Sequence, residues 1–431
     1  MRQTASPVAS VNEIRSHFPA LERRHNGHPV AYLDGPGGTQ VPQSVADAVT
    51  DYLLQHNANR HWEYPSSRET DAAIMSAREA MADWVGGAAD EIVFGANMTT
   101  LTFHLSRVLS RRWRAGDVVV VTELDHRANV DTWRTLGRER GIEVRTVRMD
   151  PADGTLDLAD LARKLTPGTR LLAVTAASNV LGTVTDIPWL AAQAHAAGAL
   201  LFVDAVHYAA HLPPDAAGWG CDFLACSVYK FYGPHIGVLW GRRGLIEQLD
   251  TPGLGVAADI SPERLETGVL CHEGIVGAGA AVNFMASLAD AGLNRRDRLL
   301  QFGAGLHARG AALSERLWRG LAAIPSVRVY GAPPGSARTP IVSFSCGALE
   351  PAVVAAGLSE EGLFVSHGHF YAPEAIAVLG AKQKTLVRAG CAAYTSMEEM
   401  ERLVDGVRRL MTDAHRNPPS GSRKPQTVEA P

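Results

Sequence analysis

The chain has 431 residues, of which 46% are hydrophobic and 20% are charged, and its net charge is -4 at pH 7. This length is enough for two or three domains with a large core. The slightly negative balance offers no basic surface to nucleic acid or anionic lipid, and no apolar run is long enough for a signal segment or a membrane span, so we expect a cytoplasmic protein.

The cysteine content argues against a disulfide framework and against a metal site. The five cysteines are odd in number and scattered, which is typical of reduced thiols in a cytosolic protein. The sequence contains neither a CxxC nor an HExxH motif, so we expect no bound metal.

A glycine-rich loop follows the first expected strand, at residues 32–34. It reads Gly-Pro-Gly-Gly from Gly35 onward, and the missing side chains allow a ligand to approach the backbone, although an ordinary turn explains the run as well. Helices are expected at residues 44–54 and 70–84.

Strands and helical segments alternate between about residues 90 and 245, which predicts a parallel sheet with helices on both faces. Five polar residues lie on or just after five of these strands: Thr99, His126, Asn179, Asp204 and Lys230. Because the carboxyl ends of parallel strands meet at one edge of a sheet, where ligands bind, we expect these side chains to line one site.

Two of these residues point to specific chemistry. The helix that opens near Thr99 offers free N–H groups and a positive dipole end to a phosphate, although Thr99 could simply cap the helix. Lys230 stands between two apolar runs, just before the Gly233-Pro234 turn. A lysine buried there has a lowered pKa and forms Schiff bases with carbonyl compounds such as pyridoxal 5'-phosphate (PLP). The alternative is a lysine at a strand end that extends its amine to water.

The C-terminal part predicts a smaller mixed domain. Two helical patterns cover about residues 276–320, and short strands follow at residues 327–330, 341–344 and 385–389, the last of which carries Arg388. A loop rich in aromatic residues and histidine is expected at residues 364–371, and a last amphipathic helix at residues 397–411. The polar, proline-rich residues 415–431 are expected to be disordered.

Six motifs resemble the class V aminotransferase group of fold type I PLP enzymes, and its cysteine desulfurase-like branch in particular. They are Tyr32-Leu-Asp34, Asp125-His126-x-Ala128-Asn129, Asn179-x-x-Gly182, Val203-Asp204-x-x-His207, Ser227-x-x-Lys230-x-x-Gly233-Pro234 and Val387-Arg388. The resemblance spans about residues 12–412.

The resemblance implies an α/β fold, the fold type I PLP-dependent transferase fold. Its large domain, with a mainly parallel, seven-stranded sheet, is expected at residues 31–275. The smaller α+β domain would combine residues 1–30 and 276–414. Enzymes of this type are usually symmetric homodimers, so we expect one here.

The resemblance also implies roles for individual residues. Lys230 would hold PLP and move a substrate proton, Asp204 would pair with the ring nitrogen, and His126 would stack on the ring. Arg388 would clamp the substrate carboxylate. Further cofactor contacts are implied for Met98, Thr99, Asn179, His207, Ser227 and Tyr229, and substrate contacts for Gly35, His369 and Tyr371.

Several positions depart from the family pattern. His207 and Tyr229 replace the usual glutamine and histidine, and Glu266-Thr-Gly-Val269 replaces the Glu-x-Gly-Thr segment that reaches the partner subunit's phosphate. The loop that carries the sulfur-accepting cysteine of desulfurases normally reads Arg-x-Gly-x-x-Cys-Ala, whereas here it reads Ser366-His-Gly-His-Phe-Tyr371-Ala372. A persulfide relay needs a thiolate at that point.

These observations predict a PLP-dependent lyase that eliminates a sulfur-bearing β-substituent of an amino acid without an enzyme thiol. His367, His369 or Tyr371 could act as the acid for the leaving group, or could simply pack the loop. An epimerase or an aminotransferase on the same scaffold is the first alternative, and a non-catalytic scaffold is the second.

Overall fold

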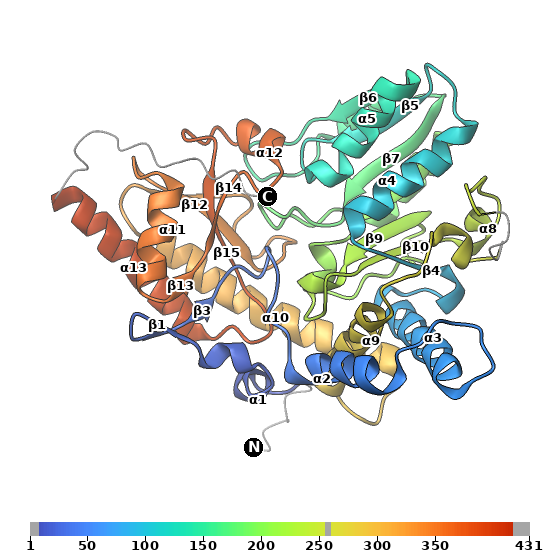
Figure 1. Ribbon diagram of the computed structural model, residues 1–431. Helices are drawn as coiled ribbons and strands as arrows, with labels where there is room; N and C mark the ends of the chain where they lie inside the picture. Colours follow the sequence, from blue (N-terminus) through green and yellow to red (C-terminus); the bar gives the residue numbers. More distant parts are fainter. Residues whose placement is uncertain (1–7, 255–259, 417–431) are drawn as a thin grey trace.

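The computed structural model describes residues 8–254 and 260–416 (Figure 1). Its main feature is a seven-stranded sheet with the strand order β4-β10-β9-β8-β7-β5-β6. The sheet consists of β4 (Ile92–Gly95), β5 (Val118–Thr122), β6 (Glu143–Val147), β7 (Thr169–Thr175), β8 (Leu200–Asp204), β9 (Phe223–Ser227) and β10 (Gly237–Gly241). Strands β9, β8, β7, β5 and β6 pair in parallel, whereas β10 runs antiparallel to β9 and β4. This topology confirms the predicted α/β fold with a mainly parallel sheet.

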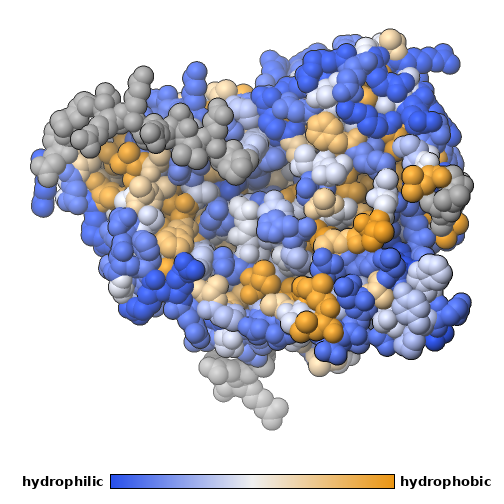
Figure 2. Space-filling model, in the orientation of Figure 1, coloured by the Kyte–Doolittle hydropathy of each residue, from blue (hydrophilic) through white to orange (hydrophobic). Residues whose placement is uncertain are grey.

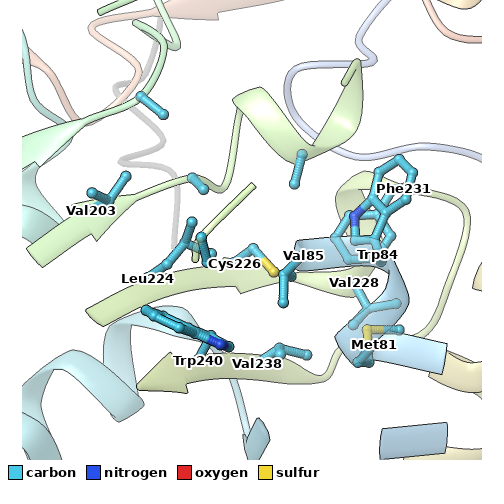
Figure 3. Close-up of a cluster of buried hydrophobic side chains, with 14 of the residues drawn as sticks. Met81, Trp84, Val85, Val203, Leu224, Cys226, Val228, Phe231, Val238 and Trp240 are labelled. Atoms are coloured by element: carbon cyan, nitrogen blue, oxygen red, sulfur yellow. The ribbon is translucent and has the colours of Figure 1, made fainter. Parts of the chain in front are cut away.

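Helices cover both faces of this sheet, because its central strands are apolar on both sides. One face packs against α3 (Pro65–Val85), α7 (Ile187–Ala196) and α9 (His272–Ser287), and the other against α4 (Met98–Leu109) and α5 (Asp131–Arg140). Figure 3 shows the first face, where Val85 of α3 lies near Cys226 of β9 and Trp84 of α3 lies beside Phe231.

The C-terminal part forms a second, antiparallel sheet with the order β11-β12-β15-β14. Its strands are β11 (Val327–Tyr330), β12 (Ile341–Cys346), β15 (Leu386–Gly390) and β14 (Ser366–Gly368). Three helices cover it: α10 (Arg295–Ala322), α11 (Pro351–Glu360) and α13 (Met397–Arg416). In Figure 1 the long α10 extends from below the large sheet to this smaller one, so it joins the two parts.

The remaining elements are short. They are α1 (Val11–Arg15), β1 (Arg24–His25), β2 (His28–Pro29), β3 (Ala31–Tyr32), α2 (Gln43–Asp51), α6 (Leu158–Lys164), α8 (Arg243–Ile246), β13 (Leu363–Phe364) and α12 (Pro373–Val378). No helix within the described ranges is both long and apolar enough to cross a membrane.

The structure corrects the prediction that residues 364–371 form a loop. Residues 366–368 are β14, which pairs with the edge of β15, and Phe364 ends β13, which pairs with β3. A neighbouring strand supplies the hydrogen bonds that stabilise such short strands, and local sequence does not reveal that neighbour. The helix predicted at residues 70–84 begins earlier, at Pro65, since proline suits the first turn of a helix.

The domain limits of residues 31–275 stay a prediction, and the packing near both limits is informative. Ala31 and Leu33 pack in the core of the C-terminal sheet, whereas α9 packs on the large sheet. Of the predicted disordered tail, residues 415 and 416 end α13, and residues 417–431 lie outside the described residues.

Candidate active site

The carboxyl ends of the parallel strands bring the predicted polar residues to one edge of the large sheet. Asp204 ends β8, and Lys230 lies in a 3-10 turn directly after β9. Arg388 of β15 reaches this edge from the smaller sheet, since its Nη1 donates to the carbonyl of Asn179, which follows β7, at 2.8 Å. The site therefore lies between the two parts of the molecule.

Lys230 carries a partly buried amine. Its Nζ donates a hydrogen bond to the Pro36 carbonyl in the glycine-rich loop and lies 5.2 Å from the centre of the Tyr229 ring. Burial, assisted by the positive charge of Arg388, lowers the pKa of Lys230 to about 7, while Asp34 and Asp204 oppose the shift. A large fraction of the amine is therefore neutral and nucleophilic near neutral pH.

Asp204 supplies a buried carboxylate beside this amine. It is 4% exposed, and its Oδ1 accepts the Val206 N–H at 2.9 Å. Burial raises the pKa of Asp204 to about 6, and the charge of Lys230 opposes the rise. Asp204 is therefore mostly ionised at neutral pH and can pair with a cation.

Behind it lies a second buried acid, Asp125, which the sequence interpretation missed as a site residue. It accepts hydrogen bonds from the Thr122 hydroxyl and, at 2.8 Å, from the Asn129 amide. Burial, with the Asp204 charge adding to it, raises the pKa of Asp125 to about 8. Asp125 belongs to the motif quoted around His126, but no local sequence pattern indicates that one buried acid lies near another.

His126 is neutral and has a fixed orientation. Its Nδ1 accepts the Ala128 N–H at 3.0 Å, which leaves the ring hydrogen on Nε2. Burial, with Lys230 and Arg388, lowers the pKa of His126 to about 4. An uncharged imidazole in this position can lie flat against an aromatic ring without the cost of burying a charge.

The start of α4 carries polar groups near the end of β9. The Asn97 side chain caps the helix at the Thr100 N–H, and the Ser227 hydroxyl accepts the Met98 N–H at 3.0 Å. The side chain of Thr99 is exposed there. The Tyr229 ring stacks on His235, with ring centroids 4.8 Å apart.

Two buried polar atoms of the site have no hydrogen-bond partner among the described residues. One is Asn179 Oδ1, whose amide nitrogen donates to the Phe370 carbonyl at 2.8 Å. The other is Nδ1 of His207, whose Nε2 lies 2.8 Å from the Thr339 hydroxyl. Buried polar atoms are almost always paired, so each of these atoms still has the capacity for one hydrogen bond.

Arg388 is 4% exposed and lies across from Lys230. Its Nη1 donates to the Asn179 carbonyl at 2.8 Å, its Nη2 lies 3.5 Å from Asp34 Oδ1, and its guanidinium lies 4.2 Å from the Phe370 ring centre. Asp34, which the sequence interpretation quoted only as part of a motif, is thus a member of the site.

The glycine-rich loop has a packing reason for its first glycine. A Cβ on Gly35 would lie 3.1 Å from the Cys391 carbonyl oxygen, so the close approach of two backbone segments favours glycine here. The role of Gly35 as a substrate contact therefore stays a prediction.

The loop between β14 and α12 brings Tyr371 to the site. The Tyr371 N–H donates to His369 Nδ1 at 3.1 Å, and the Tyr371 ring centre lies 5.2 Å from that of His126. Phe370 and Tyr371 both have a φ of 54°, a left-handed conformation that is unusual for bulky residues and often occurs at functional sites. Tyr371 is 42% exposed, so its side chain is accessible to a ligand. His367 is exposed on β14.

Glu266 forms an ion pair within its own chain. Its Oε2 lies 2.5 Å from Arg78 Nη2, and Oε1 accepts the Phe94 N–H at 2.8 Å.

Comparison with known proteins identifies the family. The model of the family described as "Aminotransferase class-V" matches residues 31–403. The chain belongs to the class V aminotransferase family. It is similar to the cysteine desulfurases of Pectobacterium atrosepticum, 32% identical over 417 residues with 93% of this chain and 98% of the relative covered, and of Serratia proteamaculans, 32% identical over 416 residues with the same coverage.

Solved structures agree with this assignment. The apo cysteine desulfurase of Thermococcus onnurineus superposes with a TM-score of 0.83 at 27% identity, covering 93% of this chain and 98% of that chain. The cysteine desulfurase CsdA of Escherichia coli gives a TM-score of 0.81 at 25% identity, covering 94% and 99%. As a class V aminotransferase, the chain is a PLP-dependent enzyme that acts on an amino acid, as predicted.

The residues present fit PLP. The amine of Lys230 suits the aldehyde of the cofactor, and the buried carboxylate of Asp204 suits its ring nitrogen. The neutral imidazole of His126 suits the ring face, and the helix start with Thr99 and the nearby Ser227 suits the phosphate.

Proposed function

We propose that this class V aminotransferase is a carbon–sulfur lyase that eliminates the β-substituent of a sulfur-bearing amino acid without a persulfide-forming cysteine. The observation that carries the proposal is Tyr371. It stands where the resemblance places the sulfur-accepting cysteine, and its ring lies beside His126.

The state of the five cysteines supports the proposal. Cys221, Cys226, Cys346 and Cys391 are buried, and burial raises the pKa of each thiol, to about 12 for the last two. Figure 3 shows Cys226 among apolar side chains. Cys271 is exposed as a residue. Partial burial of its thiol, together with the nearby Glu273, still raises the pKa of this thiol. A persulfide relay needs an accessible thiolate. Four of the thiols are buried, and the exposed Cys271 lies outside the loop of residues 366–372, where the resemblance places the sulfur-accepting cysteine.

Bound PLP supplies an electron sink for the negative charge that develops at the substrate Cα. In this proposal Lys230 would hold the cofactor, and its amine, which has a pKa near neutrality when free, would accept the Cα proton once the substrate amine has displaced it. Asp204 would keep the ring nitrogen protonated, and His126 would cover one face of the ring. Met98, Thr99 and Ser227 would hold the phosphate, with a further contact from Tyr229.

Arg388 binds the substrate carboxylate through its free donor positions, because a guanidinium matches a carboxylate in two parallel hydrogen bonds. Tyr371 donates a proton to the departing sulfur, and His369, which accepts the Tyr371 N–H, holds the loop in place. This assignment gives the leaving group an acid in the position where desulfurases would need a nucleophile.

We also propose that the protein is a cytoplasmic homodimer. Apolar patches interrupt the hydrophilic face in Figure 2. Several large apolar side chains are exposed on the segments around α2, α3 and residue 269: Leu53, Leu54, Trp62, Tyr64, Met75 and Val269. Such side chains are typical of the apolar centre of a subunit interface.

The test is incubation of the purified holoenzyme with a panel of amino acids that includes cysteine, cystine, cysteine conjugates and sulfoxides. Elimination releases a thiol or sulfide together with pyruvate and ammonia. Alanine with transfer of sulfane sulfur contradicts the proposal, and an inverted or transaminated amino acid alone establishes the epimerase or aminotransferase alternative.

Variants of Tyr371 make the test specific. Tyr371→Phe is expected to lower the elimination rate about 100-fold, the usual effect of losing a general acid, and least for substrates with a good leaving group. The matched control is Tyr330→Phe, which removes a buried hydroxyl that bonds Ser345 in the C-terminal sheet. Equal activity of Tyr371→Phe and the wild type on all substrates refutes the role of Tyr371.

A further inference from the structure

His207 makes one short hydrogen bond across the two parts of the molecule. It follows β8 in the large domain, and its Nε2 lies 2.8 Å from the hydroxyl of Thr339, which precedes β12 of the smaller sheet. Both residues are buried, with Thr339 0% and His207 3% exposed. Nδ1 of His207 has no partner among the described residues.

The surroundings of Thr339 decide where the hydrogens lie. The Gly182 carbonyl already accepts the Thr339 backbone N–H at 2.8 Å, and its distance to the Thr339 hydroxyl is 3.4 Å, too long for a good O–H···O bond. Of the two acceptors within reach of the hydroxyl hydrogen, His207 Nε2 at 2.8 Å is better placed than the Gly182 carbonyl, which favours Thr339 as the donor to His207. A neutral imidazole that accepts at Nε2 carries its own hydrogen on Nδ1.

The geometry points to Thr339 as a positioning residue that fixes this tautomer of His207, so that Nδ1–H donates to the 3'-oxygen of bound PLP. The inference rests on the placement of PLP between His126 and Asp204 under the proposed function. It adds a residue from the smaller domain to the control of the cofactor.

Asn179 cannot donate the hydrogen bond to the 3'-oxygen. Only an NH₂ group can face the Phe370 carbonyl, so the amide orientation of Asn179 is fixed and its Oδ1, a pure acceptor, is the atom without a partner. An acceptor does not stabilise an anionic ring oxygen, whereas the Nδ1–H of His207 does.

The charged and titratable groups around His207 keep it neutral. Burial lowers its pKa well below the usual value, and His211, Arg388 and Lys230 act in the same direction. The His211 ring packs edge-on against it at 4.9 Å, and burial lowers the pKa of His211 to about 3. Asp204 lies near Lys230. His207 therefore stays neutral near neutral pH. What can change is which of its two ring nitrogens carries the hydrogen.

The tautomer has a measurable consequence for the cofactor. A hydrogen bond donated to the 3'-oxygen withdraws electron density from it and so lowers the pKa of the adjacent nitrogen that joins Lys230 to PLP. Loss of the donor raises that pKa. Because a charge-assisted hydrogen bond contributes about 1.5 kcal/mol or more, the shift is about one pH unit.

The experiment is a pH titration of the visible absorption of the holoenzyme. Thr339→Val, which removes the hydroxyl and keeps the shape, is expected to move the midpoint up by about one pH unit, while Thr339→Ser keeps the wild-type midpoint. Ser343→Ala is the matched control, since its buried hydroxyl donates to the nearby Val180 carbonyl at 2.6 Å. In a His207→Gln background, Thr339→Val is expected to have no effect.

A second measurement needs no change at Thr339. Nitrogen-15 spectra of histidine-labelled holoenzyme, with the His207 signals identified by His207→Gln, are expected to show the hydrogen on Nδ1. A hydrogen on Nε2 overturns the inference, as does an unchanged midpoint in Thr339→Val or an equal shift in Ser343→Ala. A failed elimination assay with the expected midpoint shift contradicts the proposed function alone.

Discussion

The buried amine of Lys230 makes the stability of the PLP-free protein depend on pH. The perturbation we consider is Lys230→Met, which replaces the amine by an apolar side chain of similar length. The variant keeps the packing of the stem but removes a group that titrates differently in the folded and unfolded chains.

The size of the effect follows from the pKa of Lys230. It is about 7 in the folded protein, against about 10.4 in an unfolded chain. Between these values the unfolded chain binds more protons, so the free energy of unfolding rises with pH and is lost as the pH falls toward the folded pKa. From about pH 7 to about pH 9 the gain is roughly 2 kcal/mol, and nearer 1 kcal/mol once water around the partly exposed amine is allowed for.

The assay is urea unfolding of the apoprotein at about pH 7, 8 and 9, for the wild type and for Lys230→Met. The difference in unfolding free energy between the two proteins is expected to change by about 1 to 2 kcal/mol across this range, with the variant relatively more stable at the lower pH. The same difference at every pH would show that the amine of Lys230 is hydrated and has an ordinary pKa, and would refute its role as a neutral nucleophile.

Three further changes test other parts of the molecule. Arg388→Lys is expected to lower kcat/KM about 100-fold, because an ammonium cannot form two parallel bonds to a carboxylate; steady-state kinetics measures this, and an unchanged kcat/KM contradicts it. Asp204→Asn is expected to keep the visible absorption of PLP but to lose at least about 100-fold in turnover, so near-normal turnover excludes pairing with the ring nitrogen. Arg78→Met is expected to cost about 3 to 5 kcal/mol in urea unfolding, because it leaves Glu266 buried and unpaired. Adding Glu266→Gln should recover much of that loss, and a loss no larger than for Glu315→Gln, in an exposed helical ion pair, contradicts the reasoning.

The sequence placed the large sheet and much of its edge correctly because both depend on local pattern. Apolar strands that alternate with helices lead to parallel pairing, and parallel pairing carries Asp204 and Lys230 to the same edge. The departure at Tyr371 was equally visible, since a residue type in a motif needs no coordinates.

Only the tertiary structure decided how the second part of the molecule meets this edge. The bond from Thr339 to His207, the pairing of β14 with β15 and the ion pair of Glu266 with Arg78 join segments far apart in the chain. Each depends on the packing of two domains or two layers, which sets distances that no local periodicity encodes. The same packing buries Asp125 and fixes the hydrogen of His207, because burial removes water as the alternative partner.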